Sequence, residues 1–273
     1  MSSFKLRTEG ELRQMRRPGL IVWRAHDLAG SLVAPGVTTG EIDAAVEQFF
    51  ARCGAEALFK GVPGVVPFPA VTCMSVNEEV VHGIPGPRKL VEGDIVSIDT
   101  GARLDGWCGD ACVSHRVGVV SDEKERLLDV TLKTLELAIE ALATASYWSE
   151  VATKMEAFVK ENGFSVVEKF VGHGIGREMH QPPQVPNYVP RHFRRTDDFR
   201  LEPGLVIAVE PMVNAGTKRV RGLSDHWTQV TLDRKPSAQY EHTIALTAEG
   251  PWVMTGPPVT DEEQSFVDSL IVE

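Results

Sequence analysis

Four acidic residues interrupt apolar segments of the sequence at related positions. Asp99 and Glu210 each end such a segment, and Asp110 and Glu241 each begin one. Burial of an unpaired carboxylate costs several kcal/mol, and carboxylates gathered together repel one another. Side chains alternate between the faces of a strand, and each acid has a Ser, Cys, Ala or Thr two residues away, which leaves room for a cation. One such acid is compatible with exposure or with an arginine partner, whereas four together indicate a cation site.

Two histidines, His173 and His180, lie among three glycines in the segment VGHGIGREMH (171–180). Glycine lets the backbone approach a ligand closely. The segment does not fit the pattern GxGxxG and lacks the lysine of a phosphate-binding loop. A lone histidine is more often a packed or surface residue than a ligand, but His173 stands between two glycines and has no adjacent side chain against which to pack. We therefore add His173 to the acidic set.

Four carboxylates and one imidazole form an oxygen-rich set that suits two divalent transition metals such as Mn, Fe or Co. Two dications would balance the four carboxylates while the histidine stays neutral. Ions about 3.5–4 Å apart generate a hydroxide and stabilise a tetrahedral intermediate. The residue types therefore predict metal-assisted hydrolysis of a carbonyl compound.

The elements that must position these residues are mixed helices and strands. Capping-box patterns, Thr8-x-x-Glu11 and Thr38-x-x-Glu41, predict helices that run to about residues 31 and 51. Amphipathic spacing predicts another helix over about 122–145, and the stop signal Asn162-Gly163 ends a shorter one over about 150–161. Segments rich in β-branched residues predict strands over 94–100, 111–120, 205–213, 228–232 and 241–247. Helices and strands do not strictly alternate, so we expect the α+β class rather than a doubly wound parallel sheet.

A weak internal repeat groups the four acids into two pairs. In LVEGDIVSID (90–99) and RLEPGLVIAVE (200–210), a turn glycine is followed six residues later by a carboxylate. The repeat predicts two related halves, about 90–165 and 166–256, that each contribute two acids. We expect these halves to form a single catalytic domain over residues 1–273, with a short flexible segment at about 1–7.

Composition excludes several classes of protein. The 273 residues include 28 Lys and Arg against 38 Asp and Glu, a net charge of −10, with 42% hydrophobic residues, as in ordinary globular proteins. The acidic balance disfavours a specific nucleic-acid partner, because such proteins usually bind through basic surfaces. We see neither an apolar run of about 18 residues nor a secretory signal, and the four cysteines form no CxxC pair. We therefore expect a cytoplasmic protein without membrane contact.

The sequence resembles the type I methionine aminopeptidases in five motifs that occur in order. These are SVNEEVVHGIP (75–85), DIVSIDTGARLDGWCGD (94–110), GHGIGREMH (172–180), VIAVEPMVNAG (206–216) and SAQYEHTIALT (237–247). The resemblance extends from about residue 8 to residue 256. It implies the pita-bread fold, in which two pseudo-symmetric halves form a curved antiparallel sheet covered by helices. It also implies a metalloaminopeptidase that removes the initiator methionine from nascent proteins when the second residue is small.

The resemblance implies a role for each residue of the site. Two divalent metal ions, drawn from Co, Mn, Fe, Ni and Zn, would be held by Asp99, Asp110, His173, Glu210 and Glu241. His82 would contact the scissile amide nitrogen, and His180 would stabilise the tetrahedral intermediate. Glu210 would also act as the general base on the attacking water. The implied partners are the N-termini of nascent polypeptides and the ribosome surface, and we expect a monomer.

Two further sites and two departures follow from the same resemblance. A methionine pocket, beside the substrate-contacting His82 and His180, would be lined by Phe68, Cys73, Met179 and Trp227, for which ordinary core packing is the alternative. A monovalent cation would lie near Asn77 and Ser237. Gln181 stands where many members of the family have an acid, which would change the charge near His180. The segment 190–200 is longer than in compact bacterial members, which would alter access to the site.

Three other functions stay open as alternatives. A proline-specific peptidase of the same fold usually carries an additional N-terminal domain, for which few residues precede Asp94. A non-catalytic binding protein on this scaffold would have lost metal ligands, and none is lost here. A di-iron oxygenase would place Glu-x-x-His motifs on bundle helices, whereas the acids here lie on expected strands.

Overall fold

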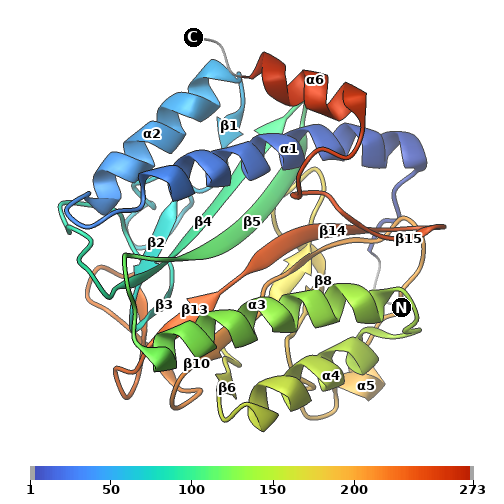
Figure 1. The fold of residues 1–273 in the computed structure, drawn as a ribbon. Coiled ribbons are helices and arrows are strands. Elements are labelled where there is room, and N and C mark those ends of the chain that lie inside the picture. Colours follow the sequence, from blue (N-terminus) through green and yellow to red (C-terminus); the bar gives the residue numbers. More distant parts are fainter. Residues whose placement is uncertain (1–3, 271–273) are drawn as a thin grey trace.

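A curved antiparallel sheet of nine strands runs through the middle of the molecule (Figure 1). The computed structural model describes residues 4–270. Seven strands lie in the order β1-β4-β5-β14-β9-β7-β8, with β2 beside β4 and β15 beside β14. Their bounds are β1 Glu56–Ala57, β2 Cys73–Val76, β4 Ile95–Leu104, β5 Trp107–Arg116, β7 Gly172–Gly174, β8 Gln181–Val185, β9 Val206–Val209, β14 Glu241–Thr247 and β15 Gly250–Val253.

Two small antiparallel sheets extend one end of the large sheet. The first has the order β13-β10-β6 and the second the order β11-β12-β3. Their bounds are β3 Glu79–Val81, β6 Ser165–Val166, β10 Met212–Asn214, β11 Val220–Gly222, β12 Gln229–Thr231 and β13 Ser237–Gln239. Helices and antiparallel sheets in one chain confirm the expected α+β class.

Two long helices cover one half of the sheet. Helix α1 (Glu9–Leu32) and helix α2 (Thr39–Arg52) begin with the expected capping boxes. In each box the threonine hydroxyl accepts from the backbone N–H of the glutamate three residues later, and the carboxylate of that glutamate accepts from the backbone N–H of the threonine. Their apolar faces, including Ile21 and Ile42, bury against Val96 and Ile98 of β4. Helix α6 (Asp261–Ser269) lies beside α1 (Figure 1). Our sequence reading missed α6, although Thr260-x-x-Glu263 is the same kind of start signal.

A second pair of helices covers the other half of the sheet (Figure 1). Helix α3 (Asp122–Leu142) and helix α4 (Trp148–Glu161) pack with β9 and β14 around Leu135, Trp148, Ile207 and Ile244. The short helix α5 (Phe193–Thr196) adds the buried Phe193 to this core. The two helical pairs thus seal one face of the sheet along its length.

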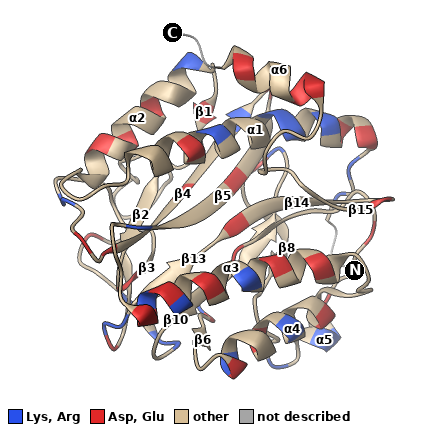
Figure 2. Ribbon diagram, viewed as in Figure 1, with Lys and Arg blue, Asp and Glu red and all other residues tan. Residues whose placement is uncertain are grey.

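The alternation of side chains in β4 separates the core from the polar face. Val96 and Ile98 point toward the helices, so Ser97 and Asp99 point to the opposite face. The same alternation directs Ile244 to the helices and Glu241 away from them. Figure 2 shows acidic positions within β5 and at the start of β14, whereas most other charges lie on helices and loops. The helix-covered face therefore leaves the acids together on the other side.

Two strand boundaries differ from our expectation. Strand β4 is longer than predicted, and β5 has the predicted length but begins four residues earlier. The two strands are joined at Asp105–Gly106, where positive φ values of 52° and 74° suit a two-residue hairpin turn. Asp99 and Asp110 therefore lie inside strands, not at strand ends. The strand expected over 205–213 is divided into β9 and β10 at Glu210–Pro211, because proline has no N–H to donate to a sheet.

The sheet order reflects the weak repeat. The repeat segments place β4 and β9 at equivalent positions, and these strands flank the central β5–β14 pair on either side. Residues 1–3 of the segment expected to be flexible lie outside the described residues, and residues 4–7 lead into α1. Among residues 4–270, no helix combines the length and the hydropathy needed to cross a membrane.

Candidate metal centre

A cavity of about 500 Å³ opens on the face of the sheet away from the helices. Its lining combines imidazoles and carboxylates contributed by distant parts of the chain: His82, Asp99, His173, His180 and Glu210. Gln181, Gln184, Gln239 and Phe170 complete much of the wall. The cavity therefore brings together five of the residues singled out from the sequence.

Three of the candidate ligands converge closely. One side-chain donor atom from each of Asp110, His173 and Glu241 lies within 4.8 Å of the other two. The Nε2 atom of His173 is 3.9 Å from Oδ2 of Asp110 and 3.7 Å from Oε1 of Glu210. Asp99 pairs with Cys112 across the sheet, and Cys112 pairs in turn with Glu241. All five candidate ligands therefore surround one region.

The donor set fits divalent cations. Among the described residues, Asp99 Oδ1, Asp110 Oδ1 and Glu241 Oε1 are buried without a hydrogen-bond partner. Buried polar atoms are nearly always satisfied, so three orphaned oxygens at one place require an explanation. An arginine or lysine at ion-pair distance from any of these three carboxylates is not found in residues 4–270. Oxygen-rich sites of this kind suit hard or borderline dications.

Electrostatics support the same conclusion. Burial raises the pKa of Asp110 to about 7. Burial, reinforced by neighbouring carboxylates, raises the pKa values of Asp99, Glu210 and Glu241 well above their ordinary values. Four carboxylates in this arrangement cannot all be charged at neutral pH without compensating positive charge. Bound dications provide that compensation and invert the local pKa order.

The histidines of the cavity are neutral at neutral pH. Burial lowers the pKa of His173 and of His82 to about 4, and also lowers the pKa of His180. His173 Nδ1 lies 3.0 Å from the carbonyl oxygen of Gly174. The tautomer with a proton on Nδ1 donates to this oxygen and leaves the lone pair of Nε2 directed toward the carboxylates. The ring centroids of His173 and His180 are 4.3 Å apart.

Several supporting residues were not found by our sequence reading. The Thr243 hydroxyl accepts from the backbone N–H of Asp110 (3.0 Å) and donates to its carbonyl oxygen (2.8 Å). Asn187 donates to the carbonyl oxygen of Glu210 (3.0 Å), and Gln239 Nε2 lies 3.5 Å from Glu210 Oε2. Thr243 shares a strand face with Glu241, so the side-chain period of two could have identified it as a neighbour of the site. The sequence around Asn187 carries no such signal, because its contact with Glu210 depends on the fold.

The four residues expected to form a methionine pocket lie in one apolar cluster. Phe68 and Cys73 are buried in it, and Met179 and Trp227 pack against it. The Trp227 ring is 5.2 Å from Phe68 and 6.2 Å from His82, centroid to centroid. In the part of the chain that is described, none of the four lines the 500 Å³ cavity itself. Their place beside His82 is compatible both with a substrate pocket and with core packing.

Of the two residues expected near a monovalent cation, Asn77 already binds an ammonium group. Lys124 Nζ donates to Asn77 Oδ1 (2.7 Å) and to the carbonyl oxygen of Gly93 (2.6 Å). Asn77 Nδ2 donates to Asp94, and the backbone N–H of Ser237 donates to the carbonyl oxygen of Asn77. The cation itself stays a prediction.

The two departures noted in the sequence lie in different surroundings. Gln181 lines the cavity and accepts a hydrogen bond from Arg7. The segment 190–200 instead packs on the helical side, where Phe193 and Phe199 are buried and Arg194 donates to Thr153 of α4. An effect of this segment on access stays a prediction.

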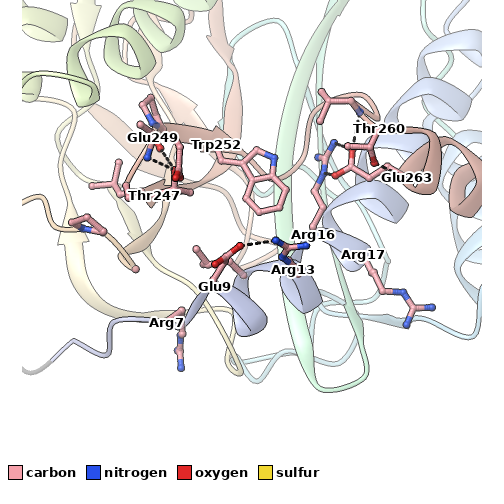
Figure 3. A pocket seen from close by; sticks show the side chains of 18 of the residues that line it. Arg7, Glu9, Arg13, Arg16, Arg17, Thr247, Glu249, Trp252, Thr260 and Glu263 are labelled. Carbon is pink, nitrogen blue, oxygen red and sulfur yellow. Dashed lines mark hydrogen bonds and ion pairs between the residues drawn. The ribbon is translucent and has the colours of Figure 1, made fainter.

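A larger groove of about 1000 Å³ lies between α1, α6 and the β14–β15 turn (Figure 3). Its polar groups are largely paired within the protein: Arg16 bonds Glu263, and Arg13 bonds Glu9, as the dashed lines in Figure 3 show. None of the site residues singled out from the sequence, all of which are described, lines this groove. The smaller cavity, rather than the larger groove, is therefore the candidate site.

Comparison with known proteins agrees with this geometry. Residues 13–248 match the model of metallopeptidase family M24. The chain is 43% identical over 249 residues to "Methionine aminopeptidase 1" of Bacillus subtilis, covering 91% of this chain and 98% of that protein. It is also similar to the crystal structure of methionine aminopeptidase from Thermotoga maritima, with 37% identity, a TM-score of 0.87, and coverage of 93% of this chain and 100% of that one.

A more distant likeness concerns the fold alone. The prolidase of Pyrococcus furiosus has a TM-score of 0.73 at 21% identity, and the match spans 93% of this chain but 66% of the prolidase. The proline-specific enzyme therefore shares the pita-bread fold expected from the sequence and has additional chain beyond it. With a family match over most of its length and close relatives of equal extent, this chain belongs to the methionine aminopeptidases of metallopeptidase family M24.

Proposed function

We propose that this protein hydrolyses the peptide bond after an N-terminal methionine, with preference for a small second residue, at the 500 Å³ cavity. The observation that carries the proposal is the convergence of Asp110, His173 and Glu241, with buried carboxylate oxygens that lack partners. Membership of the methionine aminopeptidase family supports the same reaction. The initiator methionine of nascent polypeptides is the substrate that this specificity serves.

The residues that would hold two divalent ions are Asp99, Asp110, His173, Glu210 and Glu241. When bound, such ions lower the pKa of a water molecule, polarise the substrate carbonyl and stabilise the charge that develops on its oxygen. Two dications also offset the mutual repulsion of the four carboxylates. Co, Mn, Fe, Ni and Zn are the candidate metals.

The chain's own residues divide the remaining work. Glu210, which lines the cavity, accepts the proton of the attacking water. His180, which lines the cavity next to His173, donates an N–H to the oxygen of the tetrahedral intermediate. His82 contacts the scissile amide nitrogen from the side of Trp227 and Phe170. Phe68, Cys73, Met179 and Trp227 provide an apolar, polarisable surface for the methionine side chain.

The test is methionine release from a Met-Ala-Ser peptide, together with the metal content of the protein. Asp110→Asn and His173→Ala should each lower release by about 100-fold or more, since even residues behind the ligands cost about 10- to 100-fold. Asp129→Asn is the matched control, because Asp129 is an exposed partner of Arg116. Full activity and full metal content in either ligand variant would remove that residue from the site.

Two comparisons separate the alternatives. An enzyme of the proposed specificity cleaves Met-Ala and leaves Ala-Pro intact, whereas a proline-specific peptidase does the reverse. A binding protein on this scaffold would bind no metal when purified without chelators and would stay inactive after addition of Co²⁺ or Mn²⁺. Cleavage of Ala-Pro with Met-Ala left intact would contradict the proposal, and so would a protein that binds no metal and stays inactive.

We also propose that the protein acts in the cytoplasm as a monomer, on nascent chains at the ribosome surface. Nascent N-termini are formed there, and Cys53, Cys73, Cys108 and Cys112 are all free thiols, as suits a reducing compartment. Light scattering of the purified protein tests the monomer, and co-sedimentation with ribosomes tests the association. A stable dimer, or no protein in the ribosome fraction, would contradict the corresponding part.

A further inference from the structure

Arg7 is buried in an otherwise exposed segment ahead of α1. Its exposed fraction is 8%, whereas Lys5, Leu6, Thr8 and Glu9 are exposed. Its backbone N–H donates to the carbonyl oxygen of Gly204 at 2.7 Å. A Cβ atom at Gly204 would lie 2.6 Å from the Arg7 carbonyl oxygen, so the glycine allows this close approach. The segment is thus seated against the body of the protein.

The guanidinium group of Arg7 reaches the hairpin formed by β7 and β8. Its Nη2 donates to Gln181 Oε1 at 2.8 Å. A side chain at Gly176 would collide with the same nitrogen, so Arg7 fills the space that this glycine leaves. The guanidinium carbon lies 5.2 Å from the Trp107 ring centroid, and the Arg177 guanidinium carbon lies 3.7 Å from that centroid. Arg7 is therefore held between the fully buried Trp107 and the hairpin turn.

This hairpin carries the two histidines of the active site. His173 lies in β7, and His180 directly precedes Gln181, the first residue of β8. The turn between them is held by few backbone bonds, including Cys108 N–H to the Gly176 carbonyl (2.8 Å) and Gly176 N–H to the Glu178 carbonyl (3.1 Å). Gln181, which follows His180 directly, lines the cavity and accepts the Arg7 hydrogen bond, so it joins Arg7 to the His180 end of the turn.

Charge and burial argue against a role in packing alone. A buried guanidinium is costly unless it makes hydrogen bonds, and a shorter apolar side chain would pack on Trp107 without that cost. The hydrogen bond to Gln181 is directional, and it fixes the side chain adjacent to His180. Arg7 lines the outer groove (Figure 3), and its partner Gln181 lines the catalytic cavity, so the hydrogen bond between them joins the two walls.

We propose that Arg7 is a positioning residue that, through Gln181, holds His180 in place for stabilisation of the tetrahedral intermediate. The inference rests on the proposed function. An interaction that operates only in the transition state changes kcat rather than KM. Loss of Arg7 should therefore lower kcat for Met-Ala-Ser by roughly tenfold, in the range found for residues that orient active-site groups, with KM changed less than about twofold.

The test compares five variants with the wild-type metalloenzyme. Arg7→Ala and Gln181→Leu each remove one end of the link and should lower kcat by a similar factor. The double variant should be no slower than the slower single one. Arg7→Lys retains a donor and should restore part of kcat. Arg13→Ala is the matched control, since Arg13 is an exposed arginine of α1 that pairs with Glu9 and should leave kcat unchanged.

A second readout does not depend on activity. Amide hydrogen exchange over 174–181 should be faster in Arg7→Ala and Gln181→Leu than in the wild type and Arg13→Ala, while exchange in β4 and β5 stays unchanged. Unchanged kcat, or unchanged exchange at 174–181, would overturn the inference, as would multiplicative effects in the double variant. A wild-type enzyme that releases no methionine would instead overturn the proposed function. Gln181→Leu decides the question if Arg7→Ala does not fold.

Discussion

Thr243 and Asp110 hold each other across the centre of the large sheet. The hydroxyl of Thr243 accepts from the backbone N–H of Asp110 at 3.0 Å and donates to its carbonyl oxygen at 2.8 Å, although the two residues are 133 positions apart in the sequence. Both residues are buried. One side chain thus satisfies both backbone groups of a candidate metal ligand and joins the two halves of the chain.

The first prediction concerns this contact. Thr243→Val keeps the shape of the side chain but leaves two buried backbone groups of Asp110 without partners, which costs about 1–3 kcal/mol each. The free energy of unfolding should fall by about 2 kcal/mol or more, and divalent metal affinity should fall with it. Urea denaturation and metal titration measure the two effects. Thr243→Ser, which keeps the hydroxyl, should recover most of both; equal losses in the two variants would contradict this explanation.

A second prediction uses a glycine beside the metal centre. A Cβ atom at Gly101 would lie 3.0 Å from Asp110 Oδ1, one of the unpartnered oxygens. Gly101→Ala should therefore displace this carboxylate and weaken metal binding by about 10- to 100-fold. Gly10→Ala is the matched control, because nothing lies within 4 Å of a Cβ atom at that position. It should stabilise helix α1 by about 0.5–1 kcal/mol. Calorimetric metal titration of both variants decides the matter, and equal affinities would contradict the assignment of Asp110.

The third prediction concerns pH. Burial lowers the pKa of His26 to about 3 and of His115 and His242 to about 4, in the layer between α1 and the sheet. Between pH 6.5 and pH 4 these histidines take up a proton in the unfolded state but not in the folded state, which favours unfolding. Their contribution to the free energy of unfolding is therefore fully present above pH 6.5 and is lost as the pH falls toward 4. Each histidine should cost up to about 2 kcal/mol at pH 5.

His115→Phe tests this directly, because His115 Nε2 has no hydrogen-bond partner in the described chain. The variant should lose up to about 2 kcal/mol less than the wild type between pH 7.5 and pH 5. Urea denaturation at the two pH values provides the comparison. Identical pH dependence of the two proteins would show that His115 titrates normally in the folded state.

A fourth prediction concerns the attachment of α6. Arg16 is 3% exposed and forms a two-bond ion pair with Glu263 (Figure 3). It also donates to the carbonyl oxygens of Met254, Gly256 and Pro257. Arg16→Met removes the ion-pair partner of Glu263 and the donor to these carbonyl oxygens, although Glu263 keeps its bond from the Val259 N–H. The substitution should lower the free energy of unfolding by about 3–5 kcal/mol.

The exposed pair Arg13–Glu9 is the control for α6, and Arg13→Ala should cost less than about 1 kcal/mol. The hydrogen-bond partners of Arg16 do not line the 500 Å³ cavity, so kcat at 25 °C should be unchanged while Arg16→Met stays folded. Thermal and urea denaturation measure the loss. Equal stabilities of the two variants would show that the buried ion pair does not hold α6.

The sequence by itself determined the local features. Capping boxes at Thr8 and Thr38 begin the helices where expected, since such signals depend on residues three positions apart. The acids Asp99, Asp110 and Glu241 were identified by residue type within apolar segments. The α+β class followed from the order of elements. These features depend on neighbours along the chain, which a sequence displays directly.

The tertiary structure decided everything that joins distant residues. It directs His173 Nε2 toward Asp110 and Glu210. It also places the ammonium group of Lys124 within hydrogen-bond distance of Asn77 Oδ1, and it joins Arg7 to Gln181. These contacts depend on how the two halves of the sheet and their helices pack, because a hydrogen bond needs its partners within about 3 Å and correctly oriented. Residue types along the chain can nominate such partners, but only the packed fold selects which of them meet.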